Sequence, residues 1–166
     1  MPEKHEVLVL VGPMGVGKTT IGKKLAKQLS INFSDTDAIF TAAHGPIDKF
    51  FAEHGEAKFR ELETDALREA ISTPGVVATG GGAVLSEQAK ALLSSTTVIY
   101  LSTDGKHIAS RLAHGNRPLL KNGMSDWRRI YDARKATYEQ VADFTVDTSN
   151  TPLATTIAQI REKVGR

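Results

Sequence analysis

The chain of 166 residues contains no cysteine. This absence excludes disulfide bonds, thiolate metal sites and a cysteine nucleophile. No apolar run approaches the roughly 20 residues that a membrane-spanning helix requires. Residues 1–6 lack the pattern of a signal peptide. We therefore expect a cytoplasmic protein that does not engage a membrane.

The chain also has almost no excess of charge of either sign. The formal net charge is +2, and lysine and arginine are scattered along the chain. Without a basic cluster we expect no nucleic-acid partner. The sequence has no Asn-Lys-x-Asp motif for guanine, which argues against a GTPase switch. The histidines have no metal-ligand spacing; they are His5, His44, His54, His107 and His114.

A phosphate-binding loop is the most informative feature present. The segment from Gly12 to Thr19 reads GPMGVGKT and matches the pattern G-x-x-x-x-G-K-[ST]. An apolar strand pattern precedes it and a helical pattern follows it, which is the context that the motif requires. We expect backbone N–H groups to cradle phosphates, Lys18 to reach the β- and γ-phosphates and Thr19 to ligate Mg²⁺. The predicted nucleotide-binding residues of the loop are Gly12, Met14, Gly15, Val16, Gly17, Lys18, Thr19 and Thr20.

Short apolar runs alternate with helical patterns along the rest of the chain. The predicted strands are Val7–Val11, Ile31–Ser34, Val76–Thr79, Val98–Leu101 and Phe144–Val146. The predicted helices cover residues 19–29, 56–71, 86–93, 106–112, 127–141 and a C-terminal segment capped by Thr151. This alternation predicts a single α/β domain with a parallel sheet covered on both faces. Ligands of such sheets bind beyond the carboxyl ends of the strands.

Two carboxylates follow the second predicted strand. Asp35 and Asp37 are two residues apart, so on extended chain both side chains would point to the same side. One could support Mg²⁺, and the other could accept a proton from an attacking hydroxyl. Alternatively, either residue caps the next helix.

Further candidates lie near other predicted strand ends. Either Arg60 holds a substrate carboxylate, with Glu63 one turn later keeping its guanidinium in place, or the two residues form an ordinary surface pair. The glycines 80–82 either let a ligand approach the backbone or form a loose turn. Arg117 lies in a glycine-bounded, cation-rich segment that is typical of a lid closing over phosphates. Trp127 is predicted to be a packing residue.

Taken together, these motifs resemble those of the shikimate kinase family over essentially the whole chain. They occur in order as the phosphate loop, Asp35-Thr36-Asp37, GExxFRxxE from Gly55, Gly80–Gly82, RPLL from Arg117, and RxxxYxxVAD from Arg134. The resemblance implies a three-layer fold of the nucleoside monophosphate kinase type, with a five-stranded parallel sheet of order 2-3-1-4-5. It implies transfer of phosphate from ATP, with Mg²⁺, to the 3-hydroxyl of shikimate, in the pathway to chorismate and the aromatic amino acids. It also implies a substrate-binding subdomain at about 35–63 and a lid at about 112–124.

The resemblance assigns roles to individual residues. Asp37 would be the base, with Lys18 and Arg117 stabilising the transferred phosphoryl group. Asp35 and Thr19 would belong to the Mg²⁺ site, and Arg111 would lie against adenine. The substrate-binding residues would be Asp37, Arg60, Glu63, Gly81, Gly82 and Arg134, with Ile47, Phe51 and Phe59 as apolar walls or core residues.

Two other functions stay open from the sequence. A related kinase for another hydroxy acid, such as gluconate, would also use Arg60 and Arg134. A nucleotide-binding regulator would keep the phosphate loop but would not need Asp37 as a base. We expect a monomer whose partners are ATP and a small acidic substrate.

Overall fold

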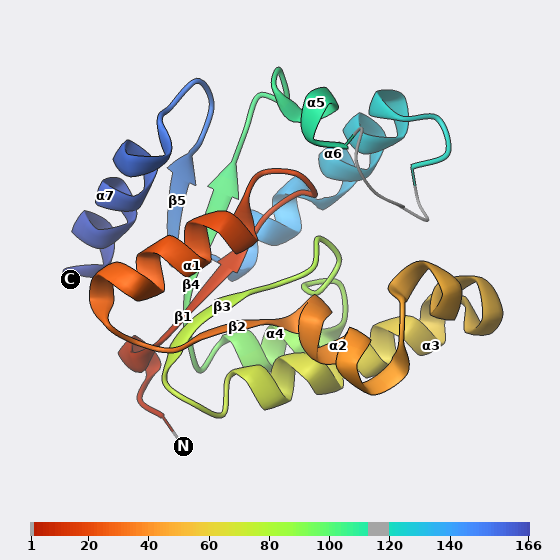
Figure 1. Cartoon of the computed structure of the whole chain (residues 1–166), viewed down its shortest axis with the longest axis horizontal. Helices are drawn as coiled ribbons and strands as arrows, with labels where there is room; N and C mark the ends of the chain where they lie inside the picture. The colour runs from red at the N-terminus through yellow and green to blue at the C-terminus, as the bar shows by residue number, and fades with distance from the viewer. Residues whose placement is uncertain (1, 113–119) are drawn as a thin grey trace.

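The computed structural model describes residues 2–112 and 120–166. Within these ranges five parallel strands form one sheet in the order β2-β3-β1-β4-β5, as predicted (Figure 1). The strands are β1 Val7–Val11, β2 Phe33–Asp35, β3 Gly75–Ala78, β4 Thr97–Ser102 and β5 Phe144–Asp147. The central strand β1 pairs with β3 through Leu8–Val76 and with β4 through Val9–Val98.

Seven α-helices accompany the sheet in the described ranges, after a short 3₁₀ turn, η1, at Lys4–Glu6. They are α1 Lys18–Leu29, α2 Thr36–His44, α3 Ile47–Ala70, α4 Glu87–Leu93, α5 Ile108–Leu112, α6 Met124–Val141 and α7 Leu153–Val164. Most predicted boundaries agree within two residues. The predicted cap at Thr151 is wrong: Pro152 takes the N-cap position, because its fixed φ suits the entry to α7, and the hydroxyl of Thr151 bonds Ser149 instead.

Alternation along β1 divides the core into two layers. Val7, Val9 and Val11 face a cluster to which α3, α4 and α6 contribute. Leu8 and Leu10 face a second cluster, to which α1 and α7 contribute. The buried run at Val7–Val11 is therefore apolar on both faces because helices cover both.

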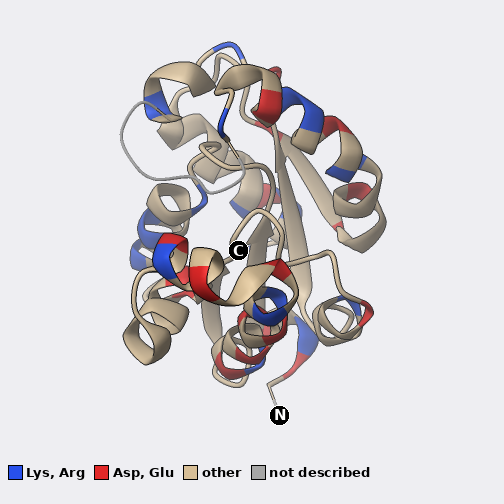
Figure 2. Cartoon of the chain, turned by 90° about the vertical axis from the view of Figure 1, so that its right-hand side faces the viewer, with Lys and Arg blue, Asp and Glu red and all other residues tan. Residues whose placement is uncertain are grey.

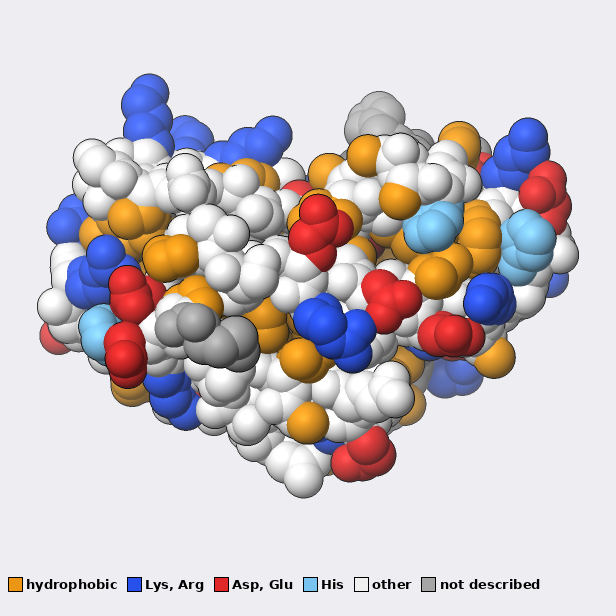
Figure 3. All heavy atoms as spheres, turned by 90° about the horizontal axis from the view of Figure 1, so that it is seen from below, with side chains coloured by type: hydrophobic (Ala, Val, Ile, Leu, Met, Phe, Trp, Pro, Cys, Tyr) orange, Lys and Arg blue, Asp and Glu red, His pale blue; other side chains and the backbone are white. Residues whose placement is uncertain are grey.

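Helices α2 and α3 extend beyond the sheet at one end of the molecule (Figure 1). Gly55, with φ 82° and ψ 170°, interrupts α3 and lets its first turns fold back toward α2. At this end Phe50 packs between the rings of His44 and His54, and histidine and hydrophobic side chains lie together on the surface (Figure 3). Acidic and basic residues are interspersed along the helices of this side (Figure 2).

The chain crosses from strand to helix at one edge of the sheet. The phosphate loop follows β1, Thr36 follows β2 and residues 79–82 follow β3. Because the strands are parallel, these segments meet at the carboxyl edge. Within the described ranges no helix is both long and apolar enough to cross a membrane.

Candidate active site

The phosphate loop joins β1 to the N-terminus of α1. Gly17 precedes α1 with φ 103°, a conformation that residues with a side chain rarely adopt. Gly12 packs so tightly that a Cβ there would lie 2.6 Å from the carbonyl oxygen of Leu101. Both glycines are thus required by the backbone. The helix that follows directs its positive end toward the loop, as an anion site requires.

Side chains hold the carbonyl groups of this loop. The Lys18 ammonium donates hydrogen bonds to the carbonyls of Gly12, at 2.7 Å, and Pro13, at 2.9 Å. Its side chain is buried, with 9% of its surface exposed. The ammonium therefore already lies over the loop where a phosphate would bind.

Asp35 uses its two carboxylate oxygens for different contacts. Oδ2 accepts a 2.6 Å hydrogen bond from the hydroxyl of Thr19, at the start of α1. Oδ1 accepts hydrogen bonds from the backbone N–H groups of Asp37 and Ala38, at 2.8 and 3.3 Å, and so caps α2. Metal support and helix capping were alternatives in the sequence, but one carboxylate has an oxygen for each.

The expected extended conformation of residues 35–37 is wrong. The strand β2 ends at Asp35, and α2 begins at Thr36, so Asp37 lies in the first helical turn. The cap formed by Asp35 is the physical reason, because it satisfies the first N–H groups of the helix. The hydroxyl of Thr36 accepts a 3.2 Å hydrogen bond from the N–H of Gly80 and ties α2 to the glycine segment. Nothing in the sequence marked Thr36 for this contact.

The pair Thr19 and Asp35 has the chemistry of a Mg²⁺ site. A hydroxyl and a carboxylate supply hard oxygen ligands, and Mg²⁺ keeps several waters and takes phosphate oxygens as further ligands. Within residues 2–112 and 120–166 no group of three or more His, Cys, Asp or Glu side chains could hold a metal by itself. The two residues fit a cation held jointly by protein and nucleotide.

Two carboxylates lie against Gly80. A Cβ at Gly80 would lie 2.9 Å from Oδ1 of Asp37 and 2.8 Å from Oε2 of Glu63. A residue with a side chain would displace at least one of them. The glycine therefore lets Asp37, from α2, and Glu63, from α3, approach the end of β3.

Arg60 is not part of an exposed pair. Its Nη1 lies 2.8 Å from Oε1 of Glu63, and its Nε lies 3.4 Å from Oε2 of Glu56. The side chains of Arg60 and Glu63 are only 17% and 5% exposed. Burial raises the pKa of Glu63, while the nearby Arg60 opposes that rise and the charge of Asp37 adds to it. The pair thus joins a buried carboxylate to a partly buried guanidinium, so its charges interact more strongly than those of an exposed pair.

Arg60 and Arg134 approach neighbouring glycines from different helices. The guanidinium of Arg60 lies so close to Gly82 that a Cβ there would collide with it. A Cβ at Gly81 would lie 3.5 Å from Nη1 of Arg134, a residue of α6 that is 8% exposed. Two guanidinium groups, one partly buried and one buried, therefore border one glycine segment, an arrangement that suits a carboxylate ligand.

The three apolar residues assigned to the substrate pocket lie in α3. Phe59 is buried and packs against Phe51, with ring centroids 5.7 Å apart, and against Phe40 of α2 at 5.0 Å. Phe51 and Ile47 are partly buried. Phe59 thus belongs to the packing between α2 and α3. Its ring also lies under Arg60, whose Cζ is 5.1 Å from the ring centroid. The sequence did not single out Phe40.

Arg111 and Trp127 both reach the phosphate loop. Nη1 of Arg111 donates to the carbonyl of Gly15 at 2.9 Å, and Trp127 donates from Nε1 to the carbonyl of Met14 at 2.8 Å. Trp127 is buried as predicted, but its bond to the loop had no signal in the sequence. Arg117 and most of the expected lid, residues 113–119, lie outside the described residues.

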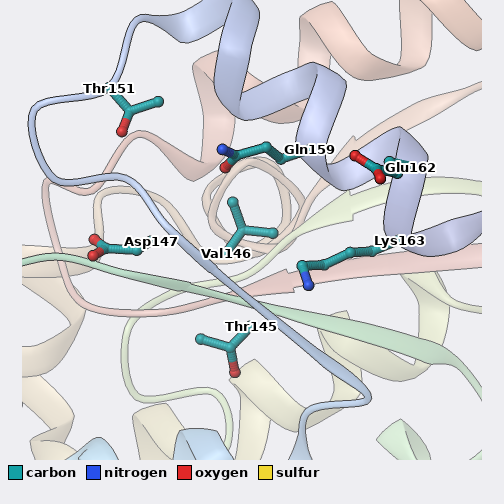
Figure 4. A pocket seen from close by; sticks show the side chains of 7 residues that line it. All are labelled: Thr145, Val146, Asp147, Thr151, Gln159, Glu162 and Lys163. Atoms are coloured by element: carbon teal, nitrogen blue, oxygen red, sulfur yellow. The ribbon is translucent and has the colours of Figure 1, made fainter.

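A separate hollow lies between β5 and α7 (Figure 4). It contains none of the candidate site residues; its lining is Thr145, Val146, Asp147, Thr151, Gln159, Glu162 and Lys163. Its side chains are mixed in charge and come from the edge strand β5, from α7 and from the segment between them. The candidate site is therefore at the carboxyl edge, around the phosphate loop.

The side chains of Asp37, Arg60, Glu63 and Arg134 around Gly80–Gly82 are here called the acid pocket, because they would receive an acid substrate. A phosphate loop on a 2-3-1-4-5 parallel sheet, with this acid pocket beside it, defines a P-loop kinase. The sequence profile described as shikimate kinase matches residues 14–165. The shikimate kinase of Streptomyces coelicolor is 44% identical over 146 residues, which cover 86% of this chain and 85% of that protein. The chain belongs to the shikimate kinase family.

Solved structures agree with this assignment. The shikimate kinase of Acinetobacter baumannii, in complex with shikimate, superposes with a TM-score of 0.89 at 34% identity and covers 95% of this chain and 91% of that one. A gluconokinase from Sinorhizobium meliloti has a TM-score of 0.62 at 18% identity, covering 99% of this chain and 94% of that one, and shares the fold alone.

Proposed function

We propose that this chain transfers the γ-phosphoryl group of ATP to the 3-hydroxyl of shikimate, giving ADP and shikimate 3-phosphate. The observation that carries this proposal is that two guanidiniums, of the partly buried Arg60 and the buried Arg134, border the same glycine segment as Asp37. Family membership makes shikimate kinase the activity to expect, and this arrangement supplies groups for each part of the substrate.

In this proposal, the acid end of shikimate binds between Arg60 and Arg134. A guanidinium presents two parallel donors to a carboxylate, so two of them fix both its position and its plane. The backbone of Gly81 and Gly82 lines the pocket, Glu63 keeps Arg60 in place, and Phe51, Phe59 and Ile47 form its apolar walls. The acceptor is then held with one hydroxyl toward Asp37.

Asp37 acts as the base. Its carboxylate takes the proton of the 3-hydroxyl as that oxygen attacks the γ-phosphorus, and the bond from this phosphorus to the β,γ-bridging oxygen breaks. Little covalent chemistry is asked of the protein, so positioning and electrostatics supply most of the catalysis. Lys18 and Arg117 stabilise the charge on the transferred group.

The nucleotide occupies the loop from Gly12 to Thr20, with Arg111 at its adenine end. Thr19 and Asp35 hold Mg²⁺, which when bound neutralises phosphate charge. We assign the subdomain at about 35–63 to the acid substrate and the segment at about 112–124 to a lid, within a single kinase domain. In this proposal the protein acts as a monomer.

A coupled assay of ADP release tests the proposal with shikimate, quinate and gluconate as acceptors. Shikimate should be turned over with the highest kcat/KM. Turnover of gluconate without shikimate would reject the proposal in favour of the second kinase. Nucleotide binding without turnover on any acceptor would favour the regulator.

Asp37→Asn tests the base. Asn keeps the size of the side chain but cannot take the proton, so kcat should fall by roughly 10²- to 10⁴-fold. Shikimate binding, measured by calorimetry, should persist. Asp65→Asn is the matched control, because Asp65 lies on α3 in an exposed pair with Arg68. An unchanged kcat in Asp37→Asn would remove Asp37 from the chemistry.

A further inference from the structure

The carbonyl groups of the phosphate loop are held by side chains at every residue from Gly12 to Val16. Lys18 bonds the first two, and Arg111 bonds the last two, with its Nη1 2.9 Å from the carbonyl of Gly15 and 3.3 Å from that of Val16. Trp127 bonds the middle one, that of Met14, at 2.8 Å. Each of these donors keeps a carbonyl turned toward the protein.

A held carbonyl also orients an amide. In a planar trans peptide the C=O and the following N–H point in opposite directions. The bond from Trp127 to the carbonyl of Met14 therefore directs the N–H of Gly15 away from α6. That N–H belongs to the loop that curls around phosphates.

The same relation recurs in the glycine segment after β3. The hydroxyl of Tyr138 donates a 2.5 Å hydrogen bond to the carbonyl of Gly81. This bond directs the N–H of Gly82 away from α6, on the segment that Arg60 and Arg134 border. Burial raises the pKa of Tyr138 to about 12, so the hydroxyl keeps its proton at neutral pH and remains a donor. The nearby Arg134 opposes this rise in pKa.

The two held segments touch each other. A Cβ at Gly81 would lie 3.4 Å from Cγ of Met14 and 3.6 Å from its backbone nitrogen. Trp127 and Tyr138 lie on one face of α6, with Tyr131 and Arg134 between them at helical spacing. The helix α6 thus bonds the phosphate loop through Trp127 and the glycine segment of the acid pocket through Tyr138.

We propose that Trp127 and Tyr138 are positioning residues, which orient one amide of the nucleotide pocket and one of the shikimate pocket through the carbonyls of Met14 and Gly81. This inference rests on the proposed function, since it assigns the two segments to ATP and to shikimate. Neither residue touches a reacting atom. Each acts by fixing the direction of a peptide group.

Three single substitutions test the inference: Trp127→Phe, Tyr138→Phe and, as a matched control, Tyr131→Phe. Each keeps an aromatic ring and removes one polar hydrogen. Tyr131 is buried on the same face of α6, but its hydroxyl bonds the hydroxyl of Tyr100 and the N–H of Thr103, and neither site segment. Thermal unfolding of each variant identifies a temperature at which all the variants are fully folded, and the titrations are made at that temperature.

Calorimetric titration with ADP and, separately, with shikimate gives the readout. Trp127→Phe should weaken ADP binding by about three- to tenfold, the loss expected for one hydrogen bond, and leave shikimate affinity unchanged. Tyr138→Phe should weaken shikimate by a similar factor and leave ADP affinity unchanged. Tyr131→Phe should change neither. These opposite preferences could not arise from a general loss of packing.

Equal weakening of both ligands by both variants, or no weakening by either, would overturn the inference. If Trp127→Phe does not fold, Tyr138→Phe still decides the matter, because an unchanged shikimate affinity there refutes the mechanism. The proposed function fails separately. Wild-type protein that binds ADP but neither binds nor turns over shikimate would refute the function, while the ADP titration of Trp127→Phe would still test its part of the inference.

Discussion

Gly82 lies directly against the guanidinium of Arg60, leaving no room for a Cβ between them. The φ angle of Gly82 lies outside the left-handed region, so the backbone there would accept alanine. Glycine is needed at position 82 because the Arg60 guanidinium occupies the space that a side chain would take. The close approach connects the end of β3 to α3 and fixes where Arg60 can lie.

Gly82→Ala should displace Arg60 and raise KM for shikimate by about tenfold or more, because a charge-assisted hydrogen bond to the substrate is lost. KM for ATP should hardly change. The double variant Gly82→Ala/Arg60→Ala provides the control. If Gly82 acts through Arg60, the double variant should bind shikimate no more weakly than Arg60→Ala, and additive losses would contradict the explanation.

Lys18→Ala should lower kcat by roughly 10²- to 10³-fold, because the transferred phosphoryl group loses a preorganised positive charge. Steady-state assay at saturating ATP and shikimate measures the loss. Lys27→Ala is the matched control: it removes a lysine from the exposed last turn of the same helix. A near-normal kcat in Lys18→Ala would refute the assignment of the phosphate loop.

Asp35→Asn should separate the two contacts of this carboxylate. Asn caps a helix about as well as Asp, so the free energy of unfolding should be nearly unchanged. The Mg²⁺ concentration needed for half-maximal activity should rise about 10- to 100-fold, as is typical when a partner of a bound metal is lost. Titrating activity with Mg²⁺ at fixed ATP measures this. A normal Mg²⁺ requirement would leave Asp35 with a capping role alone.

Glu63→Gln should change how stability depends on pH. Burial raises the pKa of Glu63 above its ordinary value of 4.5, against the opposing effect of Arg60. The folded state thus binds this proton more tightly than the unfolded chain, and stability is lost as pH rises from 4.5 through the folded-state pKa. Relative to Glu63→Gln, the wild-type free energy of unfolding should fall with rising pH in this window.

Urea unfolding of both proteins, from about pH 4 to about pH 7, measures the difference. Other carboxylates titrate in both proteins, so their contributions cancel. A difference that stays constant or grows with pH would show that Arg60 outweighs burial at Glu63.

The layers of the fold were predictable because they depend on periodic burial, whereas the strand order came from the resemblance to the shikimate kinase family. The run at Val7–Val11, apolar without alternation, indicated a strand covered on both faces, and the structure confirms it. The interval from 35 to 37 was harder. Extended chain and a capped helical turn begin with the same residues, and only the hydrogen bonds of Asp35 distinguish them.

The candidate site also has a part that could be predicted from the sequence and a part that could not. Residues 12–19 form their loop from contiguous sequence, so the motif was readable without tertiary structure. The acid pocket brings together Asp37, Arg60, Glu63 and Arg134 from three helices. The residues themselves left open a carboxylate ligand for Arg60 or a surface pair with Glu63, and the surface pair was favoured. The burial of Glu63 excludes an exposed pair.

The sequence by itself determined the local chemistry of this protein: a glycine-rich loop between strand and helix, and short polar segments after the strands. The tertiary structure alone decided which carbonyls Trp127 and Tyr138 hold and how closely Arg60 approaches Gly82. Every residue has a main-chain carbonyl, so the residue type does not indicate which carbonyl accepts a hydrogen bond in the folded protein. Such contacts are visible only after the chain has folded.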